Sequence, residues 1–337
     1  MTSIKNGILS FMSTVKILVT GACGQIGTEL VTALRGKYGL NNVVATDIHD
    51  RSQMRIDGPC YTLDVLNSEA LDWMVETLGI TQIYHLAAVL SASGEKQPLQ
   101  SWDLNMKGLL NILEAARKYK LDKVFWPSSI AVFGPGSPKA SCPQNALTDP
   151  TTIYGISKVA GEYWCKYYHE KYGLDVRSIR YPGLISYSAA AGGGTTDYAV
   201  EIFHHALTEG SYTCFLHEST TLPMLYMPDA VRATIELMEA PRLALSVKSS
   251  YNLTGMKFMP SELTAEIKKH VPGFSVRYVP DHRQAIADSW PWSIDDQQAR
   301  FDWNWQPEYN LATMAADMLA NLKQINENRY AADLRSV

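Results

Sequence analysis

The stretch VKILVTGACGQIG, residues 15–27, decides the fold of this chain. Its first half is rich in β-branched residues, as in a buried strand, and three glycines spaced three apart follow at once: Gly21, Gly24 and Gly27. In a strand–turn–helix unit they permit a tight turn, a close backbone approach to a pyrophosphate, and close packing of helix on strand. The free N–H groups of the helix then face the anion. The stretch therefore predicts a dinucleotide-binding βαβ unit.

The alternation of strand and helix signals continues beyond this unit. Three more apolar runs, NVVATDI, QIYHLAA and KVFWPSS, alternate with helical patterns, the first of which ends at Gly39. A further strand, DVRSIRYPGLI, follows a helix that starts near Thr151 and stops at Gly173, where glycine suits a left-handed cap. This pattern predicts an α/β fold with a doubly wound parallel Rossmann sheet.

The second half of the chain is less regular. A glycine-rich loop opens it, and no linker-like tract separates it from the first half. We therefore predict a nucleotide-binding Rossmann domain over 15–186, with later elements near 210–260 returning to it. The remainder of 187–330 is predicted to form mainly a smaller, substrate-binding lobe.

Composition excludes several classes of protein. The 337 residues, 46% of them hydrophobic, can bury a large core. Thirty basic and thirty-four acidic residues leave no electrostatic footprint for nucleic acid. No apolar run is long enough to span a bilayer. The five cysteines are odd in number and scattered, which favours a reducing compartment over a disulfide framework.

The first residues have a different composition from the rest. They are rich in Ser and Thr, and the first acidic residue of the chain is Glu29. Residues 1–14 are compatible with a short organellar targeting segment, although arginine is lacking, and equally with an ordinary tail. We therefore expect a mitochondrial matrix location, with the cytoplasm as the alternative.

Acidic residues follow the second and third predicted strands. Asp47 stands twenty residues beyond Gly27, at the end of VVATD. A carboxylate there can accept the ribose hydroxyls and would repel a 2′-phosphate, so NAD is favoured over NADP. An aspartate at a strand end can also serve turn chemistry alone. Asp64 could contact the adenine, and the small residues of Leu86, Ala87 and Ala88 give the cofactor a surface to lie against.

Tyr154 and Lys158 are spaced i,i+4 in IYGISK and would share one face of a helix. Lowering a phenol pKa from about 10 to near 7 takes about 4 kcal/mol. A unit charge about 4 Å away supplies roughly that amount at an effective dielectric of about 20. The pair therefore predicts a general base.

Context separates this pair from two others. The same Tyr-x-x-x-Lys pattern occurs at Tyr119–Lys123 and at Tyr167–Lys171, where a solvated pair is the simple explanation. Only Tyr154 follows a strand that ends in hydroxyl side chains, Ser128 and Ser129. Ligands bind at the carboxyl ends of parallel strands, so Tyr154 and Ser129 are expected to face the same edge.

In their order along the chain, GxxGxxG, HLAA, the paired serines and YxxxK resemble the extended short-chain dehydrogenase/reductase family. The resemblance implies an NAD-dependent oxidoreductase with Ser129, Tyr154 and Lys158 as catalytic residues. Tyr154 would exchange a proton with the substrate hydroxyl, Ser129 would orient that hydroxyl, and Lys158 would lower the phenol pKa and bind ribose. The cofactor-binding set then comprises Gly21, Gly24, Gln25, Ile26, Gly27, Asp47, Asp64, Leu86, Ala87, Ala88, Asn105, Tyr154, Lys158, Tyr181 and Gly183.

Charge limits the substrate class. Many members of this family act on nucleotide-sugars, and a diphosphate needs cations or many backbone donors. The chain has no Lys or Arg between Arg180 and Arg232. Gly183 and Leu222 stand where the nucleotide-sugar enzymes typically carry asparagine and arginine. These departures predict a small substrate.

The runs PSSIAVFG, RYPGLIS, GGGTTDYAVEIF and SWPWSIDDQQAR closely resemble the short-chain-type L-threonine 3-dehydrogenases within that family. This implies oxidation of the L-threonine hydroxyl to 2-amino-3-oxobutyrate, a step of threonine catabolism. The glycines of 192–196 could offer N–H groups to a carboxylate as a nest. Substrate contacts are expected from Ser91, Ser129, Tyr154, Gly194, Thr195 and Trp290. The alternatives are a flexible hinge at the glycines, a turn at Ser91 and a core aromatic at Trp290.

Other possibilities are weaker. The chain has no CxxC or HExxH, and His204 and His205 are adjacent and point apart on a helix, so no metal site is expected. The rival functions are a nucleotide-sugar epimerase or dehydratase and a non-catalytic dinucleotide sensor. Family members commonly pair through two helices, here around Trp102 to Tyr119 and Tyr154 to Tyr172, which implies a homodimer.

Overall fold

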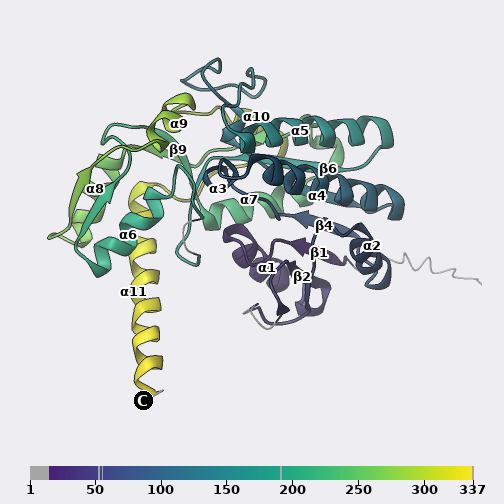
Figure 1. Cartoon of the computed structure of the whole chain (residues 1–337), viewed down its shortest axis with the longest axis horizontal. Coiled ribbons are helices and arrows are strands. Elements are labelled where there is room, and N and C mark those ends of the chain that lie inside the picture. Colours follow the sequence, from purple (N-terminus) through teal and green to yellow (C-terminus); the bar gives the residue numbers. More distant parts are fainter. Residues whose placement is uncertain (1–14, 52–53, 55, 190–191, 336–337) are drawn as a thin grey trace, which may run out of the picture.

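A computed structural model describes residues 15–51, 54, 56–189 and 192–335 of the chain (Figure 1). Its centre is a seven-stranded parallel sheet with the order β10-β6-β5-β4-β1-β2-β3. The strands are β1 (Ile17–Thr20), β2 (Val43–Asp47), β3 (Cys60–Thr62), β4 (Gln82–His85), β5 (Lys123–Ser129), β6 (Val176–Tyr181) and β10 (Tyr251–Asn252). The predicted α/β fold with a parallel Rossmann sheet is confirmed. The tail expected over 1–14 lies outside the described residues.

The strand order reverses at β1. Ile17 pairs with Val43 of β2 on one side and with Gln82 of β4 on the other. All four residues of β1 are buried, as expected for a parallel strand covered on both faces. A doubly wound sheet binds ligands outside the carboxyl ends of its strands at such a reversal. The order of strands therefore places a site beside the loop that follows β1.

Helices cover both faces of the sheet (Figure 1). Side chains of β1 alternate between the two layers, so Ile17 and Val19 pack in one core and Leu18 in the other. The first core includes residues of α1 (Gln25–Tyr38) and α7 (Met227–Glu239). The second includes residues of α2 (Ser68–Thr77), α4 (Pro98–Tyr119) and α5 (Ile153–Tyr172).

The helix α5 has the limits that its sequence predicts. The hydroxyl of Thr152 accepts the N–H of Gly155 at 3.0 Å and caps the start. Gly173 ends the helix in a left-handed conformation with φ 70°. A Cβ at Gly161 would lie 2.4 Å from the Trp126 ring. The missing side chain thus lets α5 lie close to β5.

The segment DVRSIRYPGLI differs from expectation, because it forms two strands rather than one. Pro182 separates β6 from β7 (Gly183–Ile185) and has no N–H to donate to a ladder. The strand β7 leaves the central sheet and pairs with β9 (Leu222–Tyr226), which also pairs with β11 (Met256–Phe258). This division turns the chain from the sheet toward the second half of the molecule.

The second half has its own core, which includes Tyr198, Phe203, Phe258 and Leu319. Its remaining elements are α6 (Tyr198–Thr208), β8 (Ser211–Cys214), α8 (Pro260–His270), β12 (Ser275–Tyr278), α9 (Arg283–Ser289), α10 (Gln297–Trp303) and α11 (Leu311–Arg335). The strands β8 and β12 pair in parallel. Two elements from this part of the chain belong with the central sheet: α7 packs on it, and β10 is its edge strand. The exact domain limits stay a prediction. Among the described helices, none has the length and apolar character needed to cross a membrane.

Candidate active site

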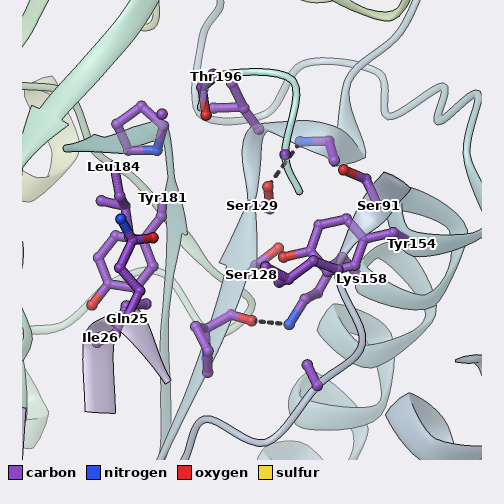
Figure 2. A pocket seen from close by; sticks show the side chains of 18 of the residues that line it. Gln25, Ile26, Ser91, Ser128, Ser129, Tyr154, Lys158, Tyr181, Leu184 and Thr196 are labelled. Atoms are coloured by element: carbon purple, nitrogen blue, oxygen red, sulfur yellow. Dashed lines mark hydrogen bonds between the residues drawn. The ribbon is translucent and has the colours of Figure 1, made fainter. Parts of the chain in front are cut away.

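A cavity opens at the carboxyl edge of β1, β4, β5 and β6, where the strand order reverses (Figure 2). The glycine loop, the two serines at the end of β5 and the start of α5 meet around it. Sixteen predicted site residues line it: Gly21, Gly24, Gln25, Ile26, Gly27, Leu86, Ala88, Ser91, Ser129, Tyr154, Lys158, Tyr181, Gly183, Gly194, Thr195 and Trp290. Long-range folding therefore joins the predicted cofactor and chemical ends in one space.

The glycine loop has no room for side chains at two of its three glycines. Gly21 has φ +69°, and a Cβ there would lie 2.6 Å from the backbone nitrogen of Ala87. A Cβ at Gly27 would lie 2.3 Å from the Gly21 oxygen. Gly24 is the N-cap of α1, and no side chain caps that helix end. The helix N-terminus is thus open to an anion, as a pyrophosphate site requires.

Asp47 lies at the end of β2, beside this loop, and its side chain is 9% exposed. Its Oδ2 accepts the N–H of Cys23 at 2.9 Å, and its Oδ1 lies 2.6 Å from Nδ1 of His49. Burial opposes the charge of the carboxylate, but the hydrogen bonds from Cys23 and His49 outweigh it and lower the Asp47 pKa. The carboxylate is therefore ionised and oriented, as ribose recognition would need.

Four predicted cofactor residues do not line the cavity, namely Asp47, Asp64, Ala87 and Asn105. Asp64 accepts the N–H of Leu66 at 2.9 Å, which is turn chemistry. The amide of Asn105 bonds both backbone groups of Val89, at 2.8 and 3.1 Å. In this structure Asn105 thus fixes the segment after β4 on α4, and its cofactor role stays a prediction.

Lys158 is a buried cation beneath the Tyr154 ring (Figure 2). Its Nζ donates to the Pro127 carbonyl at 2.6 Å and lies 5.3 Å from the centroid of the Tyr154 ring. It also lies 4.5 Å from the centroid of Trp126. Burial lowers the Lys158 pKa to about 7.

The phenol of Tyr154 differs from expectation in its acidity. Burial raises its pKa to about 12, although a hydrogen bond with Ser129 acts in the opposite direction. The Lys158 ammonium donates to the Pro127 carbonyl, and no hydrogen bond between it and the phenol is present among the described residues. The arrangement therefore holds Tyr154 protonated, and its acidification needs a positive charge supplied at the site.

The two serines at the end of β5 have different partners. Ser128 is buried, and its hydroxyl donates to Glu162 at 2.6 Å. Ser129 is partly exposed to the cavity, and its hydroxyl accepts the N–H of Ala131 at 3.2 Å. Both serines line the cavity, but the Ser128 hydroxyl is engaged by a buried carboxylate, and the catalytic role of Ser129 stays a prediction.

Sequence reasoning missed a buried ion pair beneath the site. Arg180 of β6 donates to both carboxylate oxygens of Glu162, at 2.8 and 2.7 Å. Arg180 also donates to the side chain of Asn252 in β10 at 3.0 Å. Glu162 stands four residues after Lys158, one helical turn further along α5, and this spacing was the available signal. The network connects α5 to β6 and β10.

The substrate end differs from the predicted nest. The N–H groups of Gly193 and Gly194 both donate to Oδ2 of Asp197, each at 2.6 Å. The chain's own carboxylate therefore takes the donors that were expected to face a substrate carboxylate. Asp197, which sequence reasoning missed, also lines the cavity. Burial raises its pKa, although the glycine N–H groups act in the opposite direction.

Ser91, Thr195 and Trp290 are buried residues of the cavity wall, at 7%, 2% and 7% exposure. Trp290 also belongs to the core of the second half, and its contact with substrate stays a prediction. Lys158 is the one cation among the described residues that line the cavity. Leu222 is fully buried in β9. Among the described residues that line the cavity, no second cationic group is available for the diphosphate of a sugar nucleotide.

Comparison with known proteins agrees with this geometry. The sequence pattern of the NAD-dependent epimerase/dehydratase family matches residues 17–253. An uncharacterised epimerase/dehydratase of Staphylococcus haemolyticus is 49% identical over 93% of this chain and 99% of its own length.

Two solved structures are also similar. The holo form of an L-threonine dehydrogenase from Cupriavidus necator is 56% identical, with a TM-score of 0.89, over 91% of this chain and 99% of that one. A monomeric L-threonine 3-dehydrogenase from a metagenome is 49% identical, with a TM-score of 0.89, over 92% and 99%. The expected family resemblance is thereby confirmed. The chain belongs to the NAD-dependent epimerase/dehydratase family and is an NAD-dependent oxidoreductase.

Proposed function

We propose that this enzyme oxidises the side-chain hydroxyl of L-threonine to 2-amino-3-oxobutyrate, with NAD⁺ as the acceptor. One observation carries the proposal. A single cavity joins the open N-terminus of α1 to Ser129, Tyr154 and Lys158, and Lys158 is the one cation on its described walls. Such a site suits a small hydroxy compound beside a dinucleotide. Similarity to two threonine dehydrogenase structures supports the choice of substrate.

The residues of the chain have separate roles in the proposed reaction. Ser129 orients the substrate hydroxyl, and Tyr154 removes its proton. When bound, NAD⁺ supplies the hydride acceptor and a positive charge that favours the phenolate. Lys158 donates to the Pro127 carbonyl and lines the cavity, where it would bind a ribose hydroxyl of the cofactor. Asp47 would accept the adenosine ribose hydroxyls.

An absorbance assay of NADH formation tests the substrate. We expect turnover with L-threonine, weaker turnover with L-serine and L-allo-threonine, and none with UDP-glucose. Turnover of UDP-sugars without any of L-threonine would replace this proposal with the epimerase alternative. Binding of NADH without turnover of any compound would favour the dinucleotide sensor.

A pair of variants tests the base. Tyr154→Phe should retain NADH binding, because the glycine loop is untouched, while turnover falls about 10²–10⁴-fold. Tyr119→Phe is the matched control, since Tyr119 has a lysine four residues on but lies at the end of α4, outside the cavity. Equal turnover in the two variants would show that Tyr154 is not the general base.

We also propose a symmetric homodimer formed by α4 and α5. Large aromatic side chains are exposed along α5, namely Tyr163, Trp164, Tyr167 and Tyr172, at 66%, 39%, 45% and 46%. Such a stripe is costly in water, and a second copy would cover it. A similar structure is described as monomeric, so the test is decisive: light scattering should give twice the chain mass, and Trp164→Glu should give a monomer. A monomeric wild type would contradict the proposal.

The cytoplasm is the location we favour, because the curated relatives are bacterial proteins. The mitochondrial expectation depends on residues 1–14, which lie outside the described residues. Mass spectrometry of the N-terminus of the native protein distinguishes the two. An intact terminus fits the cytoplasm, whereas removal of about the first 14 residues would restore the organellar expectation.

A further inference from the structure

Three side chains with metal-ligating atoms converge where the glycine loop meets the end of β2. The Sγ of Cys23, a carboxylate oxygen of Asp47 and a ring nitrogen of His49 all lie within 4.8 Å of one another. Among the described residues, this is the one group of three or more such side chains at that spacing. We propose that Cys23, Asp47 and His49 bind Zn²⁺, and that the bound ion excludes NAD from the enzyme.

The three residues are already held together by hydrogen bonds. The Asp47 carboxylate accepts the Cys23 N–H at 2.9 Å on one oxygen and faces Nδ1 of His49 at 2.6 Å on the other. In a tetrahedral zinc site, ligand atoms stand about 3.3–3.6 Å apart. Small side-chain rotations therefore convert the hydrogen-bonded group into a coordinating one.

The chemistry of the donor set selects the metal. Thiolate, imidazole and carboxylate are the ligands that Zn²⁺ takes in proteins, whereas Mg²⁺ and Ca²⁺ prefer oxygen alone. Three protein ligands leave a fourth position for water or another exchangeable ligand. The His49 side chain is 59% exposed, which gives the ion a path from solvent. Asp47, with its side chain 9% exposed, forms the inner wall of the site.

Zinc and NAD would compete for the same carboxylate. Asp47 is the group assigned to the adenosine ribose, and Cys23 lies in the loop between Gly21 and Gly24. A carboxylate that coordinates zinc directs its lone pairs at the ion, so it cannot accept both ribose hydroxyls. The ion would also add positive charge and its own bound water where the ribose must lie. Zinc is therefore expected to raise the apparent Kd for NADH without touching Tyr154 or Ser129.

The thiol must lose its proton when the metal binds. The thiolate is also the ligand that gives a spectroscopic signal, because Co²⁺ bound to sulfur absorbs in the near ultraviolet.

Direct binding measurements test the proposal without any substrate. The full chain, first treated with a chelator, is titrated with ZnCl₂ by calorimetry and with CoCl₂ by absorption spectroscopy. We expect one Zn²⁺ to bind per chain and a sulfur-to-cobalt absorption band to appear. We also expect Zn²⁺ to reverse, by competition, the fluorescence change that NADH binding causes. His49→Gln and Cys23→Ser should each weaken zinc binding at least about tenfold.

His282→Gln is the matched control. Nδ1 of His282 lies 3.8 Å from Oδ1 of Asp281, which makes a second His–Asp pair. Among the described residues, no cysteine completes a metal-ligating group at this pair. This variant should bind zinc as the wild type does. Thermal melting in the presence of chelator shows whether each variant is folded. Zinc binding that survives both cluster variants, or that leaves the NADH affinity unchanged, would overturn the proposal. Neither result depends on whether L-threonine is the substrate.

Discussion

The cofactor end and the substrate end of this cavity are built in different ways. The glycine loop of the cofactor end is one continuous segment, in which β1 runs into α1. Its shape is set by backbone contacts, since a Cβ added at Gly27 would lie 2.3 Å from the Gly21 oxygen. The substrate end is assembled from Ser91, Thr195, Asp197 and Trp290, which three separate parts of the chain provide.

The difference teaches where each end is sensitive to mutation. A site made of backbone tolerates no added atoms, because backbone cannot rotate away. A site made of side chains can adjust: the atom nearest to a Cβ added at Gly194 would be a carboxylate oxygen of Asp197, at 3.0 Å. Between the two ends lies the buried network of Ser128, Glu162 and Arg180, which fixes α5 to the sheet.

The largest effect is expected where that network is broken. Glu162→Leu leaves Arg180 buried and unpaired, and should lower the free energy of unfolding by about 3–5 kcal/mol. Glu170→Gln on the same helix is the control, because the Lys166–Glu170 pair is exposed and 3.7 Å long. That change should cost less than about 1 kcal/mol in denaturant titrations. Equal losses would show that the network does not link the two ends.

A smaller effect is expected at the glycine loop. Gly27→Ala forces its Cβ onto the Gly21 and Ala22 backbone, and should cost about 1–3 kcal/mol and weaken NADH binding. Gly36→Ala lies on the same helix with nothing within 4 Å, and should stabilise the protein by about 0.5–1 kcal/mol. Fluorescence titration with NADH and thermal melting check both. Unchanged NADH affinity in Gly27→Ala would contradict the claim that the glycine loop, built from backbone, tolerates no added atoms.

The third effect has the opposite sign and concerns Lys158. Burial lowers its pKa from the ordinary 10.5 to about 7, so the unfolded chain binds the proton more tightly than the folded one. The wild type should therefore gain stability as pH rises from about 7 to about 10.5. Lys158→Met removes this penalty and should stabilise the inactive enzyme by about 1–4 kcal/mol at pH 7.

Denaturant midpoints measured across that pH window test this account. The advantage of Lys158→Met over the wild type should shrink toward the alkaline end. An advantage that stays constant with pH would show that packing against Trp126, rather than the buried charge, decides the stability.

Sequence reasoning succeeded where function lies in short segments. Gly21, Gly24 and Gly27 stand in one turn, and Tyr154 and Lys158 in one turn of α5, so spacing alone places them. It also placed the end of α5 at Gly173, because a left-handed cap is a local property. The parallel α/β sheet followed from the alternation of strand and helix signals.

It failed where distant residues decide a partner. Asp197 takes the N–H groups of Gly193 and Gly194, although an open nest was expected from the glycines. The cluster of Cys23, Asp47 and His49 has no local metal motif, since parallel pairing of β1 and β2 brings its members together. The split at Pro182 has a visible cause, but the pairing of β7 with β9 has no local signal.

The sequence by itself determined the Rossmann sheet, the dinucleotide loop and the Tyr154–Lys158 turn, because glycine geometry, side-chain period and helical spacing act within a few residues. Only the tertiary structure decided that Lys158 is bonded to Pro127 and that the phenol of Tyr154 is held protonated. It also decided that Glu162 pairs with Arg180 and that Asp197 accepts the N–H of Gly193. Those outcomes depend on burial and on contacts between distant segments, and both exist only once the chain is folded.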